Sequence, residues 1–202
     1  MIGKAGIRAA LVVAALALAA CAGQVRKPVP PDAGKLAQQS ARESTLVARA
    51  DWSLRGRLGV SDGHDSGSGS LEWSQKSSTF RFSVHAPVTG KTWVLSGDDT
   101  HARLDGLREQ TIEGGDAASL LQRELGWEVP VTQLRYWVRA GRAPGAADIE
   151  FRDDGLPALI TQAGWTVRYI DYDLAQDPPL PSKVFATRGD RKVRLAVREW
   201  GP

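Results

Sequence analysis

The stretch WSLRGRLGV, residues 52–60, decides how this chain is expected to fold. Its apolar residues Trp52, Leu54, Leu58 and Val60 all stand at even positions. Side chains two residues apart lie on the same face of a β-strand. The segment therefore predicts a strand with one apolar and one polar face.

The same two-residue period recurs along most of the chain beyond Asp51. Short polar turns, such as SGDD at 96–99, separate the segments that carry it. Further strands are predicted around Leu71 and Trp73, Phe80–Val84, Thr92–Leu95, Ala102–Leu104, Ile149–Phe151, Trp165–Tyr169 and Val193–Val197. Strands that alternate in this way form antiparallel sheets with one face on a core. The segment SDGHDSGSGS, 61–70, has the composition of a flexible hairpin loop.

Three segments have a helical period instead. Residues 32–50 carry a weak apolar stripe and predict a helix that packs one face only. Residues 116–126 begin at Asp116, a good N-cap, and stop at Gly126. A further helix is predicted after Pro130, over 131–141, with Leu134, Trp137 and Val138 on one face. The stripe of the first helix consists of Leu36, Ala37, Ala41, Leu46, Val47 and Ala50. Helices are thus available to cover the apolar side of one curved sheet.

The N-terminus has the pattern of a secretory signal. Lys4 and Arg8 precede an uncharged run that ends at Leu18-Ala19-Ala20-Cys21. The run is shorter than the roughly 20 residues that a membrane-spanning helix needs. Its end matches the bacterial lipobox, which predicts cleavage before Cys21 and lipid on its sulfur; the alternative is an ordinary signal with an incidental cysteine. Resemblance to bacterial lipoproteins implies that Ala22 directs the protein to the outer membrane.

These features divide the chain into three parts. Residues 1–20 are the predicted signal peptide, 21–31 a lipidated N-terminus with a Pro-rich tether, and 32–202 a single domain. The chain has 26 basic and 23 acidic residues, and removing Lys4 and Arg8 leaves 24 against 23. A nearly neutral domain has no nucleic-acid footprint.

No enzyme signature is present in the sequence. Cys21 is the single cysteine, so an acylated protein has no free thiol for a disulfide or a metal site. His64, His85 and His101 lack the spacing of metal ligands. Neither a G-x-S-x-G elbow nor a P-loop occurs. We therefore expect a protein without catalytic activity, cofactor or metal.

Several segments resemble the LolB family of outer-membrane lipoprotein receptors. They lie in family order and span almost the whole predicted domain: Trp52 with RGRLGV at 55–60, LEWSQ at 71–75, FRFSVHAPVTG at 80–90, LGWEVPVTQLRYWVRA at 125–140, Gln162 with GWTVRY, LPSK at 180–183 and Trp200. The resemblance implies a mainly β fold with α, an incomplete, unclosed antiparallel β-barrel covered by short helices that encloses a hydrophobic cavity. It also implies that the protein accepts triacylated lipoproteins from a LolA-like periplasmic carrier and inserts them into the outer membrane.

Apolar strand and helix residues are the candidates for lining that cavity, with plain core packing as the alternative for each. Leu134 and Trp137 are also candidates for a movable cover, as opposed to a static core contact. The cavity candidates are Trp52, Leu54, Leu58, Trp73, Phe82, Val84, Leu95, Leu134, Trp137, Phe151, Trp165 and Val167.

The loop APVTG, 86–90, is a candidate for membrane contact, with a buried turn as the alternative. Pro87 cannot donate to a strand ladder and Gly90 permits a tight return. In the LolB family an exposed leucine follows the proline and touches the membrane. Here Val88 takes that place; it is smaller, and Thr89 separates it from Gly90.

Two other functions remain compatible with the residues. A related lipoprotein could carry phospholipid or glycolipid in the same kind of cavity, and a scaffold lipoprotein could hold partners of an outer-membrane assembly machine. The expected partners are the LolA-like carrier, lipoprotein cargo and outer-membrane lipid, and the protein is expected to be a monomer. Arg191, Arg194 and Arg198 could meet an acidic rim of the carrier or form an ordinary solvated strand face.

Overall fold

The computed structural model describes residues 32–87 and 90–202, which belong to one compact unit. The predicted signal peptide, Cys21 and the Pro-rich tether lie outside the described residues, as does Val88. None of the described helices is long and apolar enough to cross a membrane.

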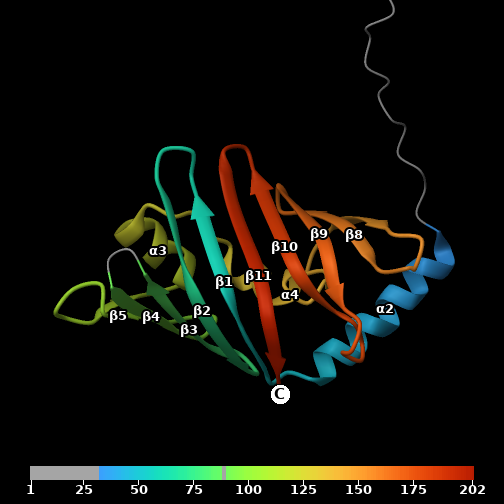
Figure 1. Cartoon of the computed structure of the whole chain (residues 1–202), viewed down its shortest axis with the longest axis horizontal. Helices are drawn as coiled ribbons and strands as arrows, with labels where there is room; N and C mark the ends of the chain where they lie inside the picture. Colours follow the sequence, from blue (N-terminus) through green and yellow to red (C-terminus); the bar gives the residue numbers. More distant parts are fainter. Residues whose placement is uncertain (1–31, 88–89) are drawn as a thin grey trace, which may run out of the picture. The chain divides into compact units, whose positions relative to one another are not determined.

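The described residues form one antiparallel sheet of 11 strands (Figure 1). Strands that follow one another in the sequence pair with each other except β6 and β7, and β1 pairs with β11 at the centre of the sheet. β6 and β7 lie at the two edges and do not pair with each other, so the barrel is unclosed, as predicted. The strands are β1 Trp52–Ser61, β2 Ser66–Lys76, β3 Thr79–Ala86, β4 Lys91–Gly97, β5 Ala102–Asp105, β6 Ile112–Gly114, β7 Ala147–Phe151, β8 Pro157–Gln162, β9 Trp165–Asp173, β10 Leu180–Arg188 and β11 Arg191–Gly201.

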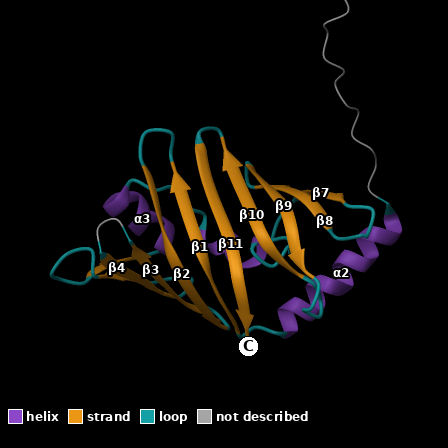
Figure 2. Ribbon diagram, in the orientation of Figure 1, coloured by secondary structure: helices purple, strands orange, loops and turns teal. Residues whose placement is uncertain are grey.

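Among the described residues, three helices accompany the sheet: α2 (Ala33–Ala48), α3 (Ala117–Leu125) and α4 (Val131–Trp137) (Figure 2). α3 begins as predicted, because the Asp116 carboxylate accepts from the Ser119 N–H at 2.9 Å. It ends at Gly126, whose φ of 72° suits a glycine C-cap. α4 is shorter than predicted, since the chain turns at Ala140 with a φ of 55°.

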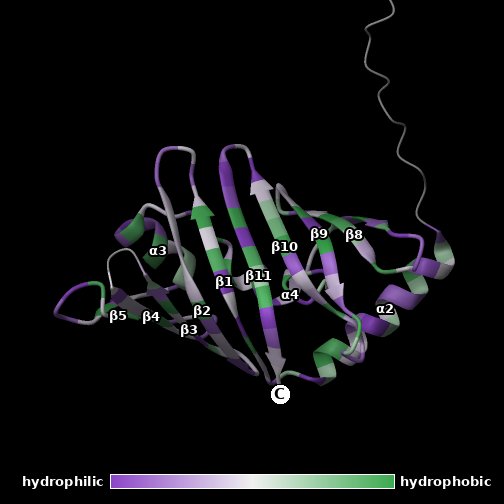
Figure 3. Cartoon of the chain, in the orientation of Figure 1, coloured by the Kyte–Doolittle hydropathy of each residue, from purple (hydrophilic) through white to green (hydrophobic). Residues whose placement is uncertain are grey.

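Alternation along the strands places the core on one side of the sheet. Figure 3 shows hydrophobic and hydrophilic residues alternating along β1 and β11. In β1 the residues Trp52, Leu54 and Val60 are buried, whereas Arg55 and Arg57 are exposed. The period seen in residues 52–60 therefore sets which face of the sheet meets the helices.

A close approach at the central strand pair requires glycine. The register of β1 and β11 shifts between Arg55 and Gly56. A Cβ atom on Gly56 would lie 2.2 Å from the carbonyl oxygen of Ala196. No other residue fits at this bulge without moving the backbone.

Part of the predicted loop 61–70 is strand. β2 begins at Ser66, so the connection to β1 contains only residues 62–65. Gly67 and Gly69 are paired with Val60 and Leu58, and backbone pairing along β1 outweighs their loop-like composition. The two-residue period did not predict β6, β8 or β10. In β10, the buried residues Val184 and Ala186 do alternate, but Pro181 and Ser182 obscure the strand signal.

The buried face of α2 differs from the predicted stripe. Gln39, Arg42 and Leu46 are buried, whereas Val47 is 63% exposed. The Arg42 guanidinium donates to the carbonyls of Arg139, Ala140 and Pro179 at 2.7–2.9 Å. The helix is therefore held by charge-assisted hydrogen bonds to loops, which hydrophobic periodicity does not reveal.

We expect Arg42→Ala to lower the free energy of unfolding by roughly 2–4 kcal/mol, because it removes three charge-assisted hydrogen bonds and leaves the buried Arg139 carbonyl without this donor. Urea denaturation of an anchor-free chain, residues 24–202, measures this. Arg57→Ala, on the exposed face of β1, is the control and should change stability by less than about 0.5 kcal/mol. Equal losses in both variants would contradict the role given to Arg42.

Candidate functional site

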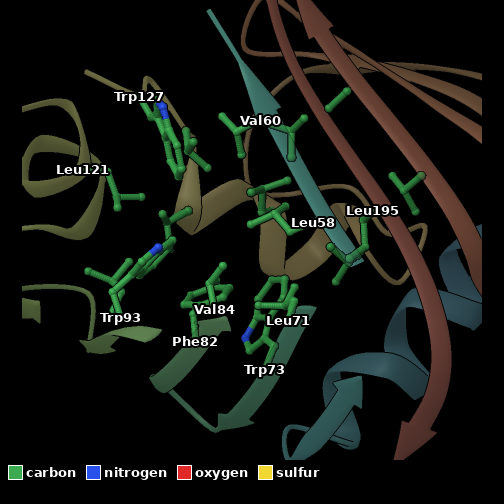
Figure 4. A pocket seen from close by; sticks show the side chains of 18 residues that line it. Leu58, Val60, Leu71, Trp73, Phe82, Val84, Trp93, Leu121, Trp127 and Leu195 are labelled. Carbon is green, nitrogen blue, oxygen red and sulfur yellow. The ribbon is translucent and has the colours of Figure 1, made fainter. Parts of the chain in front are cut away.

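An apolar cavity lies between the inner face of the sheet and the segment that carries α3 and α4. Figure 4 shows side chains from β1–β3 and β11 pointing toward the same space as Leu121 and Trp127 from the helical segment. All 18 lining side chains are hydrocarbon or tryptophan, and none carries a charge. Such a lining favours a hydrocarbon ligand over a charged one.

Six of the predicted cavity residues line this space. They come from five different elements, and the register of neighbouring strands brings them together: Trp73 lies opposite Phe82, and Phe82 opposite Leu95. The six are Leu58, Trp73, Phe82, Val84, Leu95 and Leu134.

The other six predicted residues lie elsewhere in the same core. Trp137 is fully buried, and its indole N–H donates to the Gln162 side chain at 2.9 Å, so it is a fixed contact in this structure. Trp52 lines a second hollow instead. The remaining four are Leu54, Trp165 and Val167, which are buried, and Phe151, which packs against the core while partly exposed.

Twelve further residues line the cavity. Some lie in strands that the two-residue period predicted, namely β1, β2, β4 and β11, whereas the residues of β10 and most of those in and around the helices carried no signal that pointed to the cavity. They are Val60, Leu71, Trp93, Leu121, Trp127, Val129, Val131, Val138, Val184, Ala186, Val193 and Leu195.

The cavity is small in this conformation. Its volume is about 50 Å³. For comparison, an empty apolar cavity of about 150 Å³ is known to bind benzene. A long acyl chain therefore requires part of the lining to move outward.

The linker between α3 and α4, residues 126–130, contributes Trp127 and Val129 to the lining. Its Trp127 ring lies edge-on to Trp93, with 6.2 Å between ring centroids. It packs against β2 at Gly67, where a Cβ atom would lie 2.5 Å from the indole. Glycine at this position thus allows the ring to lie close to the sheet.

Two ion pairs tie this linker to the β10–β11 hairpin. The Glu128 carboxylate pairs with Arg188 and with Arg191, at 2.6 Å for the latter. The three side chains are 33–45% exposed. Ion pairs at such exposure contribute about 0–1 kcal/mol each and weaken with salt. The ion pairs therefore add little to the packing of Trp127 and Val129 in holding the linker.

The candidate membrane loop joins β3 to β4. Pro87 is exposed, and the Gly90 N–H donates to the Ala86 carbonyl at 2.9 Å, with a φ of 67° at Gly90. The loop is thus a hairpin tip, and Pro87 is available to an outside surface.

Fold and cavity together define a class of protein: an unclosed antiparallel barrel that shelters apolar ligands beneath a helical cover. The family model described as outer membrane lipoprotein LolB matches residues 50–200. This chain belongs to the LolB family.

Two relatives of similar sequence agree with this assignment. The outer-membrane lipoprotein LolB of Xanthomonas campestris pv. campestris (strain B100) is 37% identical over 207 residues, which cover 94% of this chain and 95% of that protein. That of Xylella fastidiosa (strain 9a5c) is 33% identical over 202 residues, covering 96% and 93%. A crystal structure of a LolA superfamily protein from Nitrosomonas europaea covers 79% of this chain and 93% of that chain, with a TM-score of 0.44 and 8% identity.

We expect Glu128→Gln to speed the uptake of a fluorescent fatty acid several-fold, because it removes both ion pairs that hold the linker. Stopped-flow fluorescence measures the rate. Glu150→Gln, an exposed carboxylate on β7, is the control and should leave the rate unchanged. Added salt should accelerate the parent chain more than the Glu128 variant; identical rates and salt dependence would mean that the linker does not control uptake.

Proposed function

We propose that this LolB-family protein receives lipid-modified proteins from a LolA-like periplasmic carrier and inserts them into the outer membrane. In this proposal the acyl chains of the cargo bind in the apolar cavity while they are transferred. The cargo is released chemically unchanged, so no catalytic residue or cofactor is required. The single observation that carries the proposal is a wholly apolar cavity in a chain of this family.

The energetics of the cargo explain why such a cavity is needed. Each methylene moved out of water contributes about 0.8 kcal/mol. Up to three acyl chains hold some tens of methylenes, so their exposure to water costs on the order of tens of kcal/mol, less whatever the chains regain by collapsing together. The receptor must shelter them and still bind them less tightly than a bilayer does.

The small resting cavity is consistent with that second requirement. A cavity that is nearly closed when empty must separate its lining to admit a chain, and this lowers the net affinity. The linker 126–130 supplies the movable part of the lining, since Glu128 holds it through partly exposed ion pairs. Bound chains can then pass on to the membrane without a large barrier.

Location follows from the N-terminus in this proposal. Lipid on Cys21 would anchor the protein in the outer membrane, with the folded unit facing the periplasm as a monomer. Several acyl chains give stable anchoring, whereas one gives only reversible binding. The anchor fixes the place of action, and the cavity performs the transfer.

Filling the cavity should abolish cargo uptake. We expect Val193→Phe to reduce the binding of an acyl probe at least tenfold, because the larger ring occupies the lined space. Fluorescence titration with the anchor-free chain measures the affinity. Val94→Phe, at a β4 position outside the cavity lining, is the matched control. Unchanged affinity in a folded Val193 variant would exclude this cavity as the acyl site.

Val88→Glu tests the membrane loop. We expect it to leave folding and cargo uptake intact and to stop delivery, because a carboxylate at the hairpin tip opposes contact with lipid. Transfer of a lipoprotein from the carrier to liposomes measures delivery. Val47→Glu, at an exposed position on α2, is the control. Delivery at the normal rate by the Val88 variant would show that the loop has no such task.

A further inference from the structure

A second hollow lies at the far end of α2, beside the end of β11. Its volume is about 620 Å³, within the range of about 300–1,000 Å³ that small-molecule sites occupy. No residue lines both this hollow and the apolar cavity. It is lined by residues 46 and 48–52, Arg139, residues 176–178, Leu180 and residues 200–202.

Tryptophan rings form one wall of this second hollow. Trp52 lies between Trp200 and Trp73, with ring centroids 5.8 Å and 4.8 Å away. Trp73 belongs to the apolar cavity, so the Trp52 ring separates the two spaces. Leu46 and Leu180 extend the apolar surface on the side of the hollow. Such a wall suits a ligand with an apolar part next to a polar one.

A buried arginine faces the same hollow without an acidic partner. Arg139 is 8% exposed, and its guanidinium lies 5.0 Å from the centroid of the Trp52 ring. Its Nη1 donates to the carbonyls of Leu46 and Arg49 at 2.8 and 2.9 Å. Within residues 32–87 and 90–202, no carboxylate forms an ion pair with it. Burial, followed by the charge of Arg42, lowers the pKa of Arg139 to about 10.

Two donors at this wall also lack acceptors. Arg139 Nε and the indole Nε1 of Trp52 are buried and make no hydrogen bond with the described residues. A buried charge and unpaired donors are costly unless an anion or acceptor compensates them. The buried charge of Arg139, which has no acidic partner among the described residues, therefore favours a negatively charged group in the hollow.

The rest of the lining decides which kind of anion. Arg49 adds a second guanidinium, and it donates to the backbone carbonyl of Asp177. Asp51 and Asp177 add two carboxylates, and Asp51 also accepts from the Ser77 N–H at 2.9 Å. A purely anionic group would be repelled by these carboxylates, whereas a group with both charges is matched at each end.

We propose that this second hollow binds a zwitterionic phospholipid, with the phosphate toward Arg49 and Arg139 and the amine toward Asp51 and Asp177. Guanidinium groups are suited to phosphate oxygens. The glycerol and first methylenes lie against Trp52, Trp200 and Leu180. This site goes beyond the proposed function, because it binds a membrane lipid outside the apolar cavity, which is the space that holds the acyl chains of the cargo in the proposed function.

Calorimetric titration of the anchor-free chain with short-chain lipids below their micelle concentration tests the proposal. We expect dihexanoyl phosphatidylethanolamine to bind at least tenfold more tightly than dihexanoyl phosphatidylglycerol or hexyl maltoside. Arg49→Gln and Asp177→Asn should each weaken its binding about tenfold. Arg55→Gln, on the outer face of the sheet, is the matched control and should bind normally.

Several results would overturn the second site. Equal binding of the three amphiphiles would show that the headgroup is not recognised, and unchanged binding in the Arg49 and Asp177 variants would place the lipid elsewhere. Val193→Phe distinguishes this proposal from the proposed function, because the added ring fills the apolar cavity and leaves the second hollow unchanged. If the Val193 variant still binds phospholipid, the two sites are independent, even if cargo transfer proves absent. If it loses phospholipid binding, the lipid occupies the apolar cavity.

Discussion

The structure depends on one constraint: the apolar face of an unclosed sheet must be kept from water without being filled completely. A small closed barrel fills its interior with its own side chains. Here β6 and β7 do not pair with each other, and the segment with α3 and α4 packs against the inner face of the sheet. The space that remains is small, apolar and bounded on one side by a short linker. In the proposed function, this arrangement lets the cavity hold acyl chains away from water and later release them to the membrane.

Different parts of the cover are held with different strength. Arg42 fixes α2 to its neighbouring loops through buried hydrogen bonds to three carbonyls. The linker 126–130 is held by the partly exposed ion pairs of Glu128 and by the packing of Trp127 against Trp93 and Gly67. Buried charge-assisted bonds are costly to break, whereas exposed pairs are not. The opening in the proposed function therefore involves the linker rather than α2.

Aromatic residues separate two chemically different spaces. A row of aromatic rings runs from the second hollow to the apolar cavity, with neighbouring ring centroids 4.3–5.8 Å apart. In order, the rings are those of Trp200, Trp52, Trp73 and Phe82. On one side the lining is wholly apolar, and on the other it includes two arginines and two aspartates. These aromatic rings thus separate an apolar site from a neighbouring charged one.

The sequence by itself determined the strand alternation and the caps of α3, because these depend on residues close together in the chain. It also indicated the family, through short segments that lie in the family's order. It correctly indicated an unclosed sheet, and six of its cavity candidates line the space. Only the tertiary structure decided that Trp137 is fixed by Gln162, that α2 buries Arg42, and that Trp127 rests on Gly67. These contacts join residues far apart in sequence, and periodicity shows which face of an element is apolar without showing what packs against it.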